Sequence, residues 1–435
     1  MAYLIVNSSI IAKCYEGENT MKSQVENGKL IILLPERIDA SNSDAVNKEL
    51  QDIISGVDFQ GIVMDGEELD YISSAGLRVL LGIRKQIDKP YDVINISPKI
   101  YEIFDLTGFI DVFNVHRKPR EISLEGLKII GKGTLGTVYK LDDERVVKVY
   151  NAGAPVPYDR VEQEKKMARQ VFVKGISTAL SYEMVHANNA FGVVFELLSP
   201  VTVMDYMLEH PDEKDEMTVK VCELLKKIHS AELTGDNVPS MKNMMLASTA
   251  ALAQIFSEDE MARFQKLLSE VPDRKTAIHG DYHPGNIMVD KNKELVLIDV
   301  GDMSTSHPFF EFYDMYPVFL LADELGAYAS KYNDAMIRDF FHIGSDKEYE
   351  ERKKFMQTYW DRLLHLYFEG HSDEEIATYD SYFRGIGRLK QFITILQLPD
   401  EDPQAKMLEI GRAKELFFEE FDKIPPVEEW WPKDL

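Results

Sequence analysis

The stretch from His279 to Asp302 reads HGDYHPGNIMVDKNKELVLIDVGD, and its pattern predicts a polar loop followed by a β-hairpin. Asp281 follows a glycine, at which the chain can turn sharply, and Asn286 comes five residues later. Two short apolar runs flank Lys291-Asn292-Lys293, which is typical of a hairpin turn. Because Asp299 ends the second run, the folded hairpin brings Asn286 and Asp299 together at one end.

The polar residues of this stretch suit the chemistry of a nucleoside triphosphate. A carboxylate and a side-chain amide are both oxygen donors, so Asp299 and Asn286 suit Mg²⁺, which completes its coordination with waters and substrate phosphates. Asp281 is expected to accept a proton from an attacking hydroxyl. The alternative is an ordinary polar hairpin loop, which would require several independent elements to coincide.

The pattern His-x-Asp-x-x-x-x-Asn, followed by an aspartate after an apolar strand, resembles the catalytic loop of kinases. With His283-Pro284-Gly285 before the asparagine, it is more similar to the aminoglycoside phosphotransferase and choline kinase-like family, and the resemblance covers most of residues 122–425. It implies a two-lobed, protein-kinase-like domain with a large helical C-terminal lobe. It also implies ATP or GTP and Mg²⁺ as cofactors, with His279 and Asp302 supporting the metal site indirectly.

A glycine-rich turn precedes a strand that carries a lysine. Gly131, Gly133 and Gly136 fit Gly-x-Gly-x-x-Gly-x-Val, in which the missing side chains let the backbone approach phosphates. In the predicted strand 145–150, alternation places Lys148 on the face opposite its neighbouring valines, where it is expected to hold the α- and β-phosphates. A dinucleotide-binding alternative fails because a strand, and not a helix, follows the glycines.

The predicted helix 159–174 carries the expected partner of Lys148. Both Glu162 and Glu164 are available, and Glu164 is preferred because its spacing from the next glycine is similar to that in the phosphotransferase family. Farther along, a strand ending Val-Phe-Glu-Leu-Leu resembles the hinge that meets adenine through backbone groups. Glu196 marks the place of that hinge.

Residues 21–115 alternate predicted strands and helices, which indicates a small α/β domain with helices on one face of a sheet. The motif LDYISSAGL at 69–77 resembles the STAS domain of anti-sigma-factor antagonists, as do RIDA at 37–40 and LTGF at 106–109. In that family a serine at the start of this helix accepts a phosphate, and the alignment places Ser74 there. The aspartate that often precedes it is a serine here, and the alternative is that the two serines merely cap the helix.

The fold class is therefore α/β plus α+β: a STAS-like domain followed by a kinase-like domain. The basic, proline-containing stretch HRKPR places a linker at 116–121. The nucleotide lobe is expected at 122–198 and the helical lobe with the catalytic loop at 199–435, while residues 1–20 form an N-terminal extension. The aromatic residues of the helical lobe could line an acceptor pocket, but a helical-bundle core is favoured.

Composition limits the partners of the chain. The net charge is −25, with 13 basic and 18 acidic residues up to Arg120 and 36 basic and 56 acidic residues beyond it. The acidic excess argues against nucleic-acid and anionic-membrane partners and is compatible with a cationic substrate, although a solvated acidic surface also explains it. Cys14 and Cys222 lie far apart, and no apolar run reaches the length of a membrane span, so a cytoplasmic location is expected.

Three functions follow as hypotheses. In the first, the chain transfers the γ-phosphoryl of ATP or GTP to a hydroxyl of a small molecule, such as an amine-bearing alcohol or sugar, under regulation by the STAS domain and its protein partner. In the second, it is a protein kinase of a partner-switching pathway and acts on a serine such as Ser74. In the third, it is a nucleotide-sensing scaffold without turnover, which the complete set Asp281, Asn286 and Asp299 disfavours.

Overall fold

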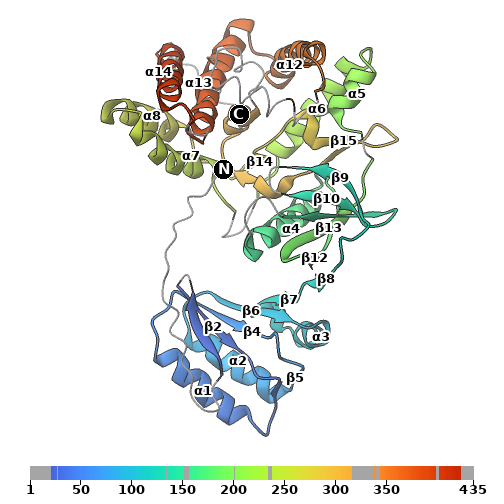
Figure 1. The fold of residues 1–435 in the computed structure, drawn as a ribbon, viewed down its shortest axis with the longest axis vertical. Helices are drawn as coiled ribbons and strands as arrows, with labels where there is room; N and C mark the ends of the chain where they lie inside the picture. Colours follow the sequence, from blue (N-terminus) through green and yellow to red (C-terminus); the bar gives the residue numbers. More distant parts are fainter. Residues whose placement is uncertain are drawn as a thin grey trace. The chain divides into compact units, whose positions relative to one another are not determined.

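The computed structural model has two compact units, Met1–Glu121 and Ile122–Leu435, each of which is considered by itself (Figure 1). The expected N-terminal extension and the C-terminal Trp430-Trp431 pair lie outside the described residues. Among the described residues, no helix combines the length and apolar composition needed to cross a membrane. The described residues are 21–26, 28–133, 136–150, 156–199, 201–233, 238–315, 338, 343–397 and 401–422.

The first unit is built on a five-stranded sheet in the order β1-β2-β4-β6-β7. Only β1 is antiparallel to its neighbour, and the other strands are parallel. Apolar residues of the strands and helices share one core. The strands are β1 (Ser23–Glu26), β2 (Lys29–Leu33), β4 (Gly61–Asp65), β6 (Tyr91–Ile96) and β7 (Asn114–Arg117), and the helices are α1 (Ser43–Ser55), α2 (Ser74–Gln86) and α3 (Pro98–Leu106), with the short η1 (Phe109–Asp111). This architecture confirms the predicted STAS-type α/β domain.

A two-stranded parallel pair, β3 (Arg37–Ile38) with β5 (Tyr71–Ile72), joins two of the three motifs that carried the STAS resemblance. The pair brings the start of α2 against the chain at Ile38. A Cβ on Gly76 would lie only 2.6 Å from the Ile38 carbonyl oxygen, so a side chain at this position would force the elements apart. The glycine of the motif is therefore a packing requirement.

The second unit begins with a sheet-rich lobe whose strands run in the order β12-β13-β11-β10-β9. Helix α4 (Tyr158–Val173) packs against β12 and β13. Strand β7 ends at Arg117 and the two-residue strand β8 (Arg120–Glu121) follows it, so both lie at least partly within the stretch predicted as a linker. The strands of this unit are β9 (Lys128–Lys132), β10 (Thr137–Lys140), β11 (Arg145–Val149), β12 (Ser181–Ala187) and β13 (Ala190–Glu196).

The remainder of the second unit is a helical lobe, which confirms the predicted kinase-like architecture. Its aromatic residues, including Phe312, Trp360 and Phe383, belong to one buried core, as the favoured interpretation expected. Two small antiparallel pairs hold the stretch His279–Asp302: β14 (Ala277–Ile278) with β17 (Ser304–Thr305), and β15 (Ile287–Val289) with β16 (Leu295–Leu297). The helices are α5 (Val203–Glu209), α6 (Lys214–His229), α7 (Met241–Ser248), α8 (Glu258–Glu270), α9 (Phe309–Met315), α12 (Asp346–Tyr367), α13 (Asp373–Gln397) and α14 (Pro403–Phe421), with the short η2 (Thr249–Gln254), η3 (Pro284–Asn286) and η4 (Val300–Asp302).

Candidate active site

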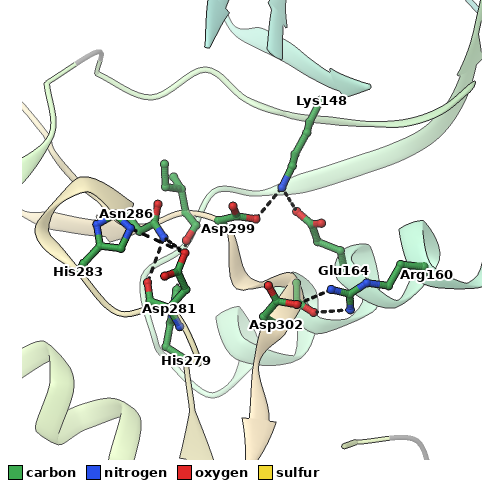
Figure 2. A network of polar contacts seen from close by, with 11 residues as sticks. Lys148, Arg160, Glu164, His279, Asp281, His283, Asn286, Asp299 and Asp302 are labelled. Carbon is green, nitrogen blue, oxygen red and sulfur yellow. Dashed lines mark hydrogen bonds and ion pairs between the residues drawn. The ribbon is translucent and has the colours of Figure 1, made fainter. Parts of the chain in front are cut away.

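The Asp281 loop leaves β14 through a glycine in the left-handed region. Gly280 has φ +82°, and a Cβ there would lie 2.9 Å from the Asp302 carbonyl oxygen, so the turn requires glycine. Within the loop, the Asn286 side-chain amide donates through Nδ2 to the Asp281 carbonyl oxygen at 3.0 Å and to Asp281 Oδ2 at 2.9 Å (Figure 2). Because the amide nitrogen faces Asp281, the Asn286 Oδ1 atom is left for another partner.

The β15–β16 hairpin brings Asp299 back beside Asn286. The register pairs Ile287 with Leu297, and the Ile298 backbone N–H donates to the Asn286 carbonyl oxygen at 3.0 Å. Asp299 then adopts φ 57°, a left-handed conformation that turns the chain into η4. The hairpin therefore unites the two residues that the sequence predicted as metal ligands.

Lys148 joins the two lobes through its ammonium group. Its Nζ lies 3.0 Å from Glu164 Oε1 and 2.6 Å from Asp299 Oδ1, and the side chain is 14% exposed (Figure 2). Burial opposes the charged form of Lys148, but the Glu164 and Asp299 carboxylates more than offset it and hold the lysine pKa above its ordinary value. Burial likewise raises the pKa of Asp299, and the Lys148 charge outweighs it to give a net lowering. Glu162, the alternative partner, instead pairs with Lys166 on the same helix at 2.9 Å.

The glycine-rich turn lies between β9 and β10, beside the strand of Lys148. Gly131 pairs with Val138 across the two strands, and the Gly133 backbone N–H donates to the Gly136 carbonyl oxygen at 2.9 Å. A Cβ on Gly136 would lie 2.2 Å from the Val149 carbonyl oxygen, so only glycine fits against this strand. Residues 134 and 135 of the turn lie outside the described part of the chain.

Glu196 ends β13 and faces the chain before β12. Its Oε2 accepts a hydrogen bond from the Leu180 backbone N–H at 3.3 Å, and its own N–H donates to the Leu180 carbonyl oxygen at 3.0 Å. The side chain therefore fixes the start of β12 to the expected hinge. The next residue, Leu197, donates its backbone N–H to the Glu144 carbonyl oxygen at 2.8 Å.

His279 and Asp302 contact different parts of the site. The buried His279 ring accepts from the Asp281 N–H through Nδ1 at 3.3 Å, and its Nε2 lies 3.2 Å from the Ile298 carbonyl oxygen, so it connects the chain at Asp281 with the chain before Asp299. Asp302 is ion-paired with Arg160 of α4 (Figure 2). It is therefore turned toward the helix that also carries Glu164.

Arg160 and Glu164 connect α4 to the loop around Asp299. Arg160 Nη1 donates to the Gly301 carbonyl oxygen at 3.1 Å. A Cβ on Gly301 would lie 2.7 Å from Glu164 Oε2, so this glycine admits the Glu164 carboxylate. The helix, Lys148 and the loop after Asp299 consequently form one connected set of contacts.

A buried carboxylate that the sequence patterns did not identify binds the backbone just before Asp281. Glu311, 0% exposed at the start of α9, accepts the backbone N–H groups of His279 at 2.6 Å and Gly280 at 2.9 Å. The His229 ring lies beside it, with Nε2 3.4 Å from Glu311 Oε2 and Nδ1 2.6 Å from the Tyr367 hydroxyl. Burial raises the Glu311 pKa, but the hydrogen bonds and positive potential of the histidines give a net lowering.

Ser74 occupies the first turn of α2 in the other unit. The Ser73 hydroxyl accepts the Ala75 N–H at 3.2 Å and caps the helix, whereas Ser74 is exposed. The cap is thus supplied by one of the two serines, and the hydroxyl of the other is accessible to solvent.

Comparisons with known proteins identify both units. A model of the phosphotransferase enzyme family matches residues 126–349, and a STAS domain model matches residues 20–122. The putative anti-sigma factor antagonist BtrV of Bordetella bronchiseptica is 33% identical over 91 residues, which cover 20% of this chain and 78% of that protein.

Two solved structures are similar to the second unit. The GDP and kanamycin complex of APH(2")-IIia is 17% identical with a TM-score of 0.43, covering 74% of this chain and 98% of that one. The choline kinase LicA from Streptococcus pneumoniae is 15% identical with a TM-score of 0.39, covering 73% and 98%.

Proposed function

This chain belongs to the phosphotransferase enzyme family and carries an N-terminal STAS domain, and we propose that it transfers the γ-phosphoryl of ATP or GTP to a hydroxyl of a small molecule under control of the STAS domain. One observation carries the proposal. Lys148, paired with Glu164, contacts Asp299 at 2.6 Å, on the loop that the β15–β16 hairpin returns to Asn286 and Asp281. The proposal thus has Lys148 as the cation for the phosphates, Asn286 and Asp299 as oxygen donors for a metal, and Asp281 as the proton acceptor.

The nucleotide side consists of the glycine-rich turn, Lys148 and two oxygen donors. We assign the backbone of Gly131, Gly133 and Gly136, together with Lys148, to the nucleotide phosphates, and the backbone at Glu196 to adenine. In the described part of the chain no three His, Cys, Asp or Glu residues cluster as a closed metal site. Two protein oxygens suffice for Mg²⁺, because this ion takes its remaining ligands from waters and phosphates.

Asn286 and Asp299 fit that role in their chemistry. The Asn286 amide nitrogen is used by Asp281, so its oxygen is available, and Asp299 uses Oδ1 for Lys148 and retains Oδ2. Mg²⁺ bound there would neutralise charge on the phosphates. His279 and Asp302 would support this arrangement through their contacts with the two chain segments and with Arg160.

Asp281 is the proposed catalytic residue. Its side chain is 45% exposed, and Oδ2 accepts the Asn286 amide, which fixes the carboxylate within the loop. In transfer, the Asp281 carboxylate would orient the acceptor hydroxyl and accept its proton as the oxygen–phosphorus bond forms and the γ-phosphoryl leaves ADP. The acidic excess of residues beyond Arg120 is compatible with an acceptor that bears an amine.

The test is to incubate the purified chain with Mg²⁺ and γ-labelled ATP or GTP and a panel of amine-bearing alcohols and sugars, with uncharged polyols of similar size as controls. We expect label to move to an amine-bearing acceptor, and each product to be identified by mass spectrometry. Nucleotide that remains intact with every acceptor would contradict the proposal.

A second candidate function rests on the exposed Ser74 and on the STAS kinship. If the chain is a protein kinase of a partner-switching pathway, its own Ser74 is a candidate substrate, since a phosphate at the start of α2 would meet free backbone N–H groups. Intact-mass measurement and peptide mapping of the same incubations distinguish the two functions. Label on Ser74 that is absent from Ser74→Ala would favour the signalling function.

A further inference from the structure

The loop between Asp281 and Asn286 contains a histidine whose tautomer is fixed by the backbone. His283 Nδ1 accepts a hydrogen bond from the Gly285 backbone N–H at 3.0 Å. A ring nitrogen that accepts a hydrogen bond carries no proton, so in the neutral ring the proton resides on Nε2. The imidazole side chain is 18% exposed and is therefore held within the site.

The protonated nitrogen of this ring faces the proposed catalytic carboxylate. His283 Nε2 lies 3.7 Å from Asp281 Oδ2, the same oxygen that accepts the Asn286 amide at 2.9 Å (Figure 2). Within the described residues, no hydrogen bond is donated to Asp281 Oδ1. The Asn286 hydrogen bond and the His283 ring, which lies beyond hydrogen-bond distance, therefore both face Oδ2, and Oδ1 is left to meet an acceptor hydroxyl.

Gly285 makes room for this arrangement. A Cβ built on Gly285 would lie 2.8 Å from His283 Cε1 and 2.9 Å from His283 Nδ1, closer than side-chain atoms approach one another. The same glycine thus supplies the hydrogen bond that orients the ring and the space that the ring occupies. Gly285 therefore fixes the orientation of the His283 ring within the loop in two ways.

We propose that His283 is a positioning residue of the phosphoryl transfer, whose Nε2–H group attracts Asp281 Oδ2 across 3.7 Å and so keeps Oδ1 toward the acceptor hydroxyl. This inference rests on the proposed function, because His283 acts through Asp281. It assigns His283 no contact with the nucleotide. Loss of the Nε2–H group should consequently lower kcat and leave the KM for the nucleotide unchanged.

The experiment compares three substitutions at one position in the full chain. His283→Asn keeps an acceptor for the Gly285 N–H near the Nδ1 position but removes the donor toward Asp281, whereas His283→Gln places an amide N–H near the Nε2 position. We expect His283→Asn and His283→Leu to lower kcat on the order of ten- to a hundredfold, as for a misplaced reactive group, and His283→Gln to recover most of it. Thermal unfolding confirms that each variant is folded.

A double-mutant cycle with Asp281→Asn separates positioning from a general structural effect. In the Asp281→Asn background, His283→Asn should lower turnover no further, because the carboxylate it orients is gone. Equal kcat for wild type, His283→Asn and His283→Leu would overturn the inference while leaving the phosphotransferase proposal intact. A wild-type chain without Asp281-dependent turnover would instead remove the proposed function and, with it, this role of His283.

Discussion

The two halves of the candidate site are constructed differently. In the Asp281 half the contacts are local, since Asn286 reaches Asp281 across five positions and His283 reaches it across two. In the Lys148 half they are distant, since Lys148 meets Asp299 across 151 positions and Glu164 across 16. The first half is thus a property of one loop, whereas the second exists only when α4, β11 and the β15–β16 hairpin are packed together.

The halves also differ in their electrostatics. Lys148 is shielded between two carboxylates, and each partner shifts the other's pKa toward the charged form. Asp281 is half exposed and accepts neutral donors. Substitutions in the distant half should therefore weaken nucleotide binding, whereas substitution of Asp281 in the local half should affect the chemical step alone.

Among the substitutions that probe nucleotide binding, the largest effect is expected for Lys148→Met. The substitution removes the cation between Glu164 and Asp299 and leaves two carboxylates facing each other without a countercharge. We expect kcat/KM for the nucleotide to fall on the order of a hundredfold or more, with a rise in KM. A KM for the nucleotide that stays at the wild-type value would contradict the proposal that the Lys148 half of the site binds the nucleotide.

A matched pair on one helix sharpens the same comparison. Glu164→Gln should lower kcat/KM on the order of tenfold because Lys148 loses a buried charged partner. Glu162→Gln, two residues away, should leave it within about twofold, since Glu162 pairs with Lys166 on the surface of the same helix. Steady-state kinetics at varied nucleotide concentration measures kcat/KM for both variants. Equal effects of the two substitutions would refute the assignment of Glu164.

Glu311→Gln tests whether the local half depends on its buried support. The carboxamide cannot accept both backbone N–H groups as the carboxylate does, so we expect about 2–4 kcal/mol less stability at neutral pH. Because folding lowers the Glu311 pKa, its contribution is present above the ordinary value of 4.5 and is lost as pH falls through the folded-state value. Denaturant unfolding should show a difference between wild type and variant that shrinks on acidification, and a pH-independent difference would contradict this account.

The smallest effect is expected at the Arg160–Asp302 pair, whose side chains are 37% and 49% exposed. Exposed ion pairs contribute little, so Arg160→Glu should reduce kcat/KM only about two- to fivefold by loosening α4. The charge-exchanged double variant, Arg160→Glu with Asp302→Arg, should recover part of that loss. Failure of the double variant to recover activity would indicate that the Arg160 contact with the Gly301 carbonyl oxygen is the important one.

The difference between the halves also explains what could be predicted from the sequence. The order of Asp281, Asn286 and Asp299 is a local pattern, and a short hairpin leaves little freedom in how these residues meet. Lys148 and its neighbouring valines follow from strand alternation alone. The spacing argument for Glu164 depended on the family resemblance, because neither glutamate is distinguished by its local sequence.

Glu311 could not be found in this way, because its partners are backbone N–H groups and leave no side-chain pattern. The available signal was a single acidic residue in the apolar run Phe309–Phe312, which burial makes costly unless it is hydrogen-bonded. The edge strands β1 and β7 also leave little signal in the sequence. Each has four residues, with mixed polar and apolar side chains and little of the alternation or apolar run that marked β2, β4 and β6.

The separation of the two halves is tested most directly by measuring nucleotide binding and turnover on one variant, Asp281→Asn, beside Asp143→Asn as a control on an exposed turn. Calorimetric titration gives the Kd for Mg²⁺–ATP, and release of labelled phosphate or product gives kcat. We predict that Asp281→Asn keeps the wild-type Kd and loses kcat by about a hundred- to ten-thousandfold, while Asp143→Asn changes neither. Unchanged kcat in Asp281→Asn would contradict the account.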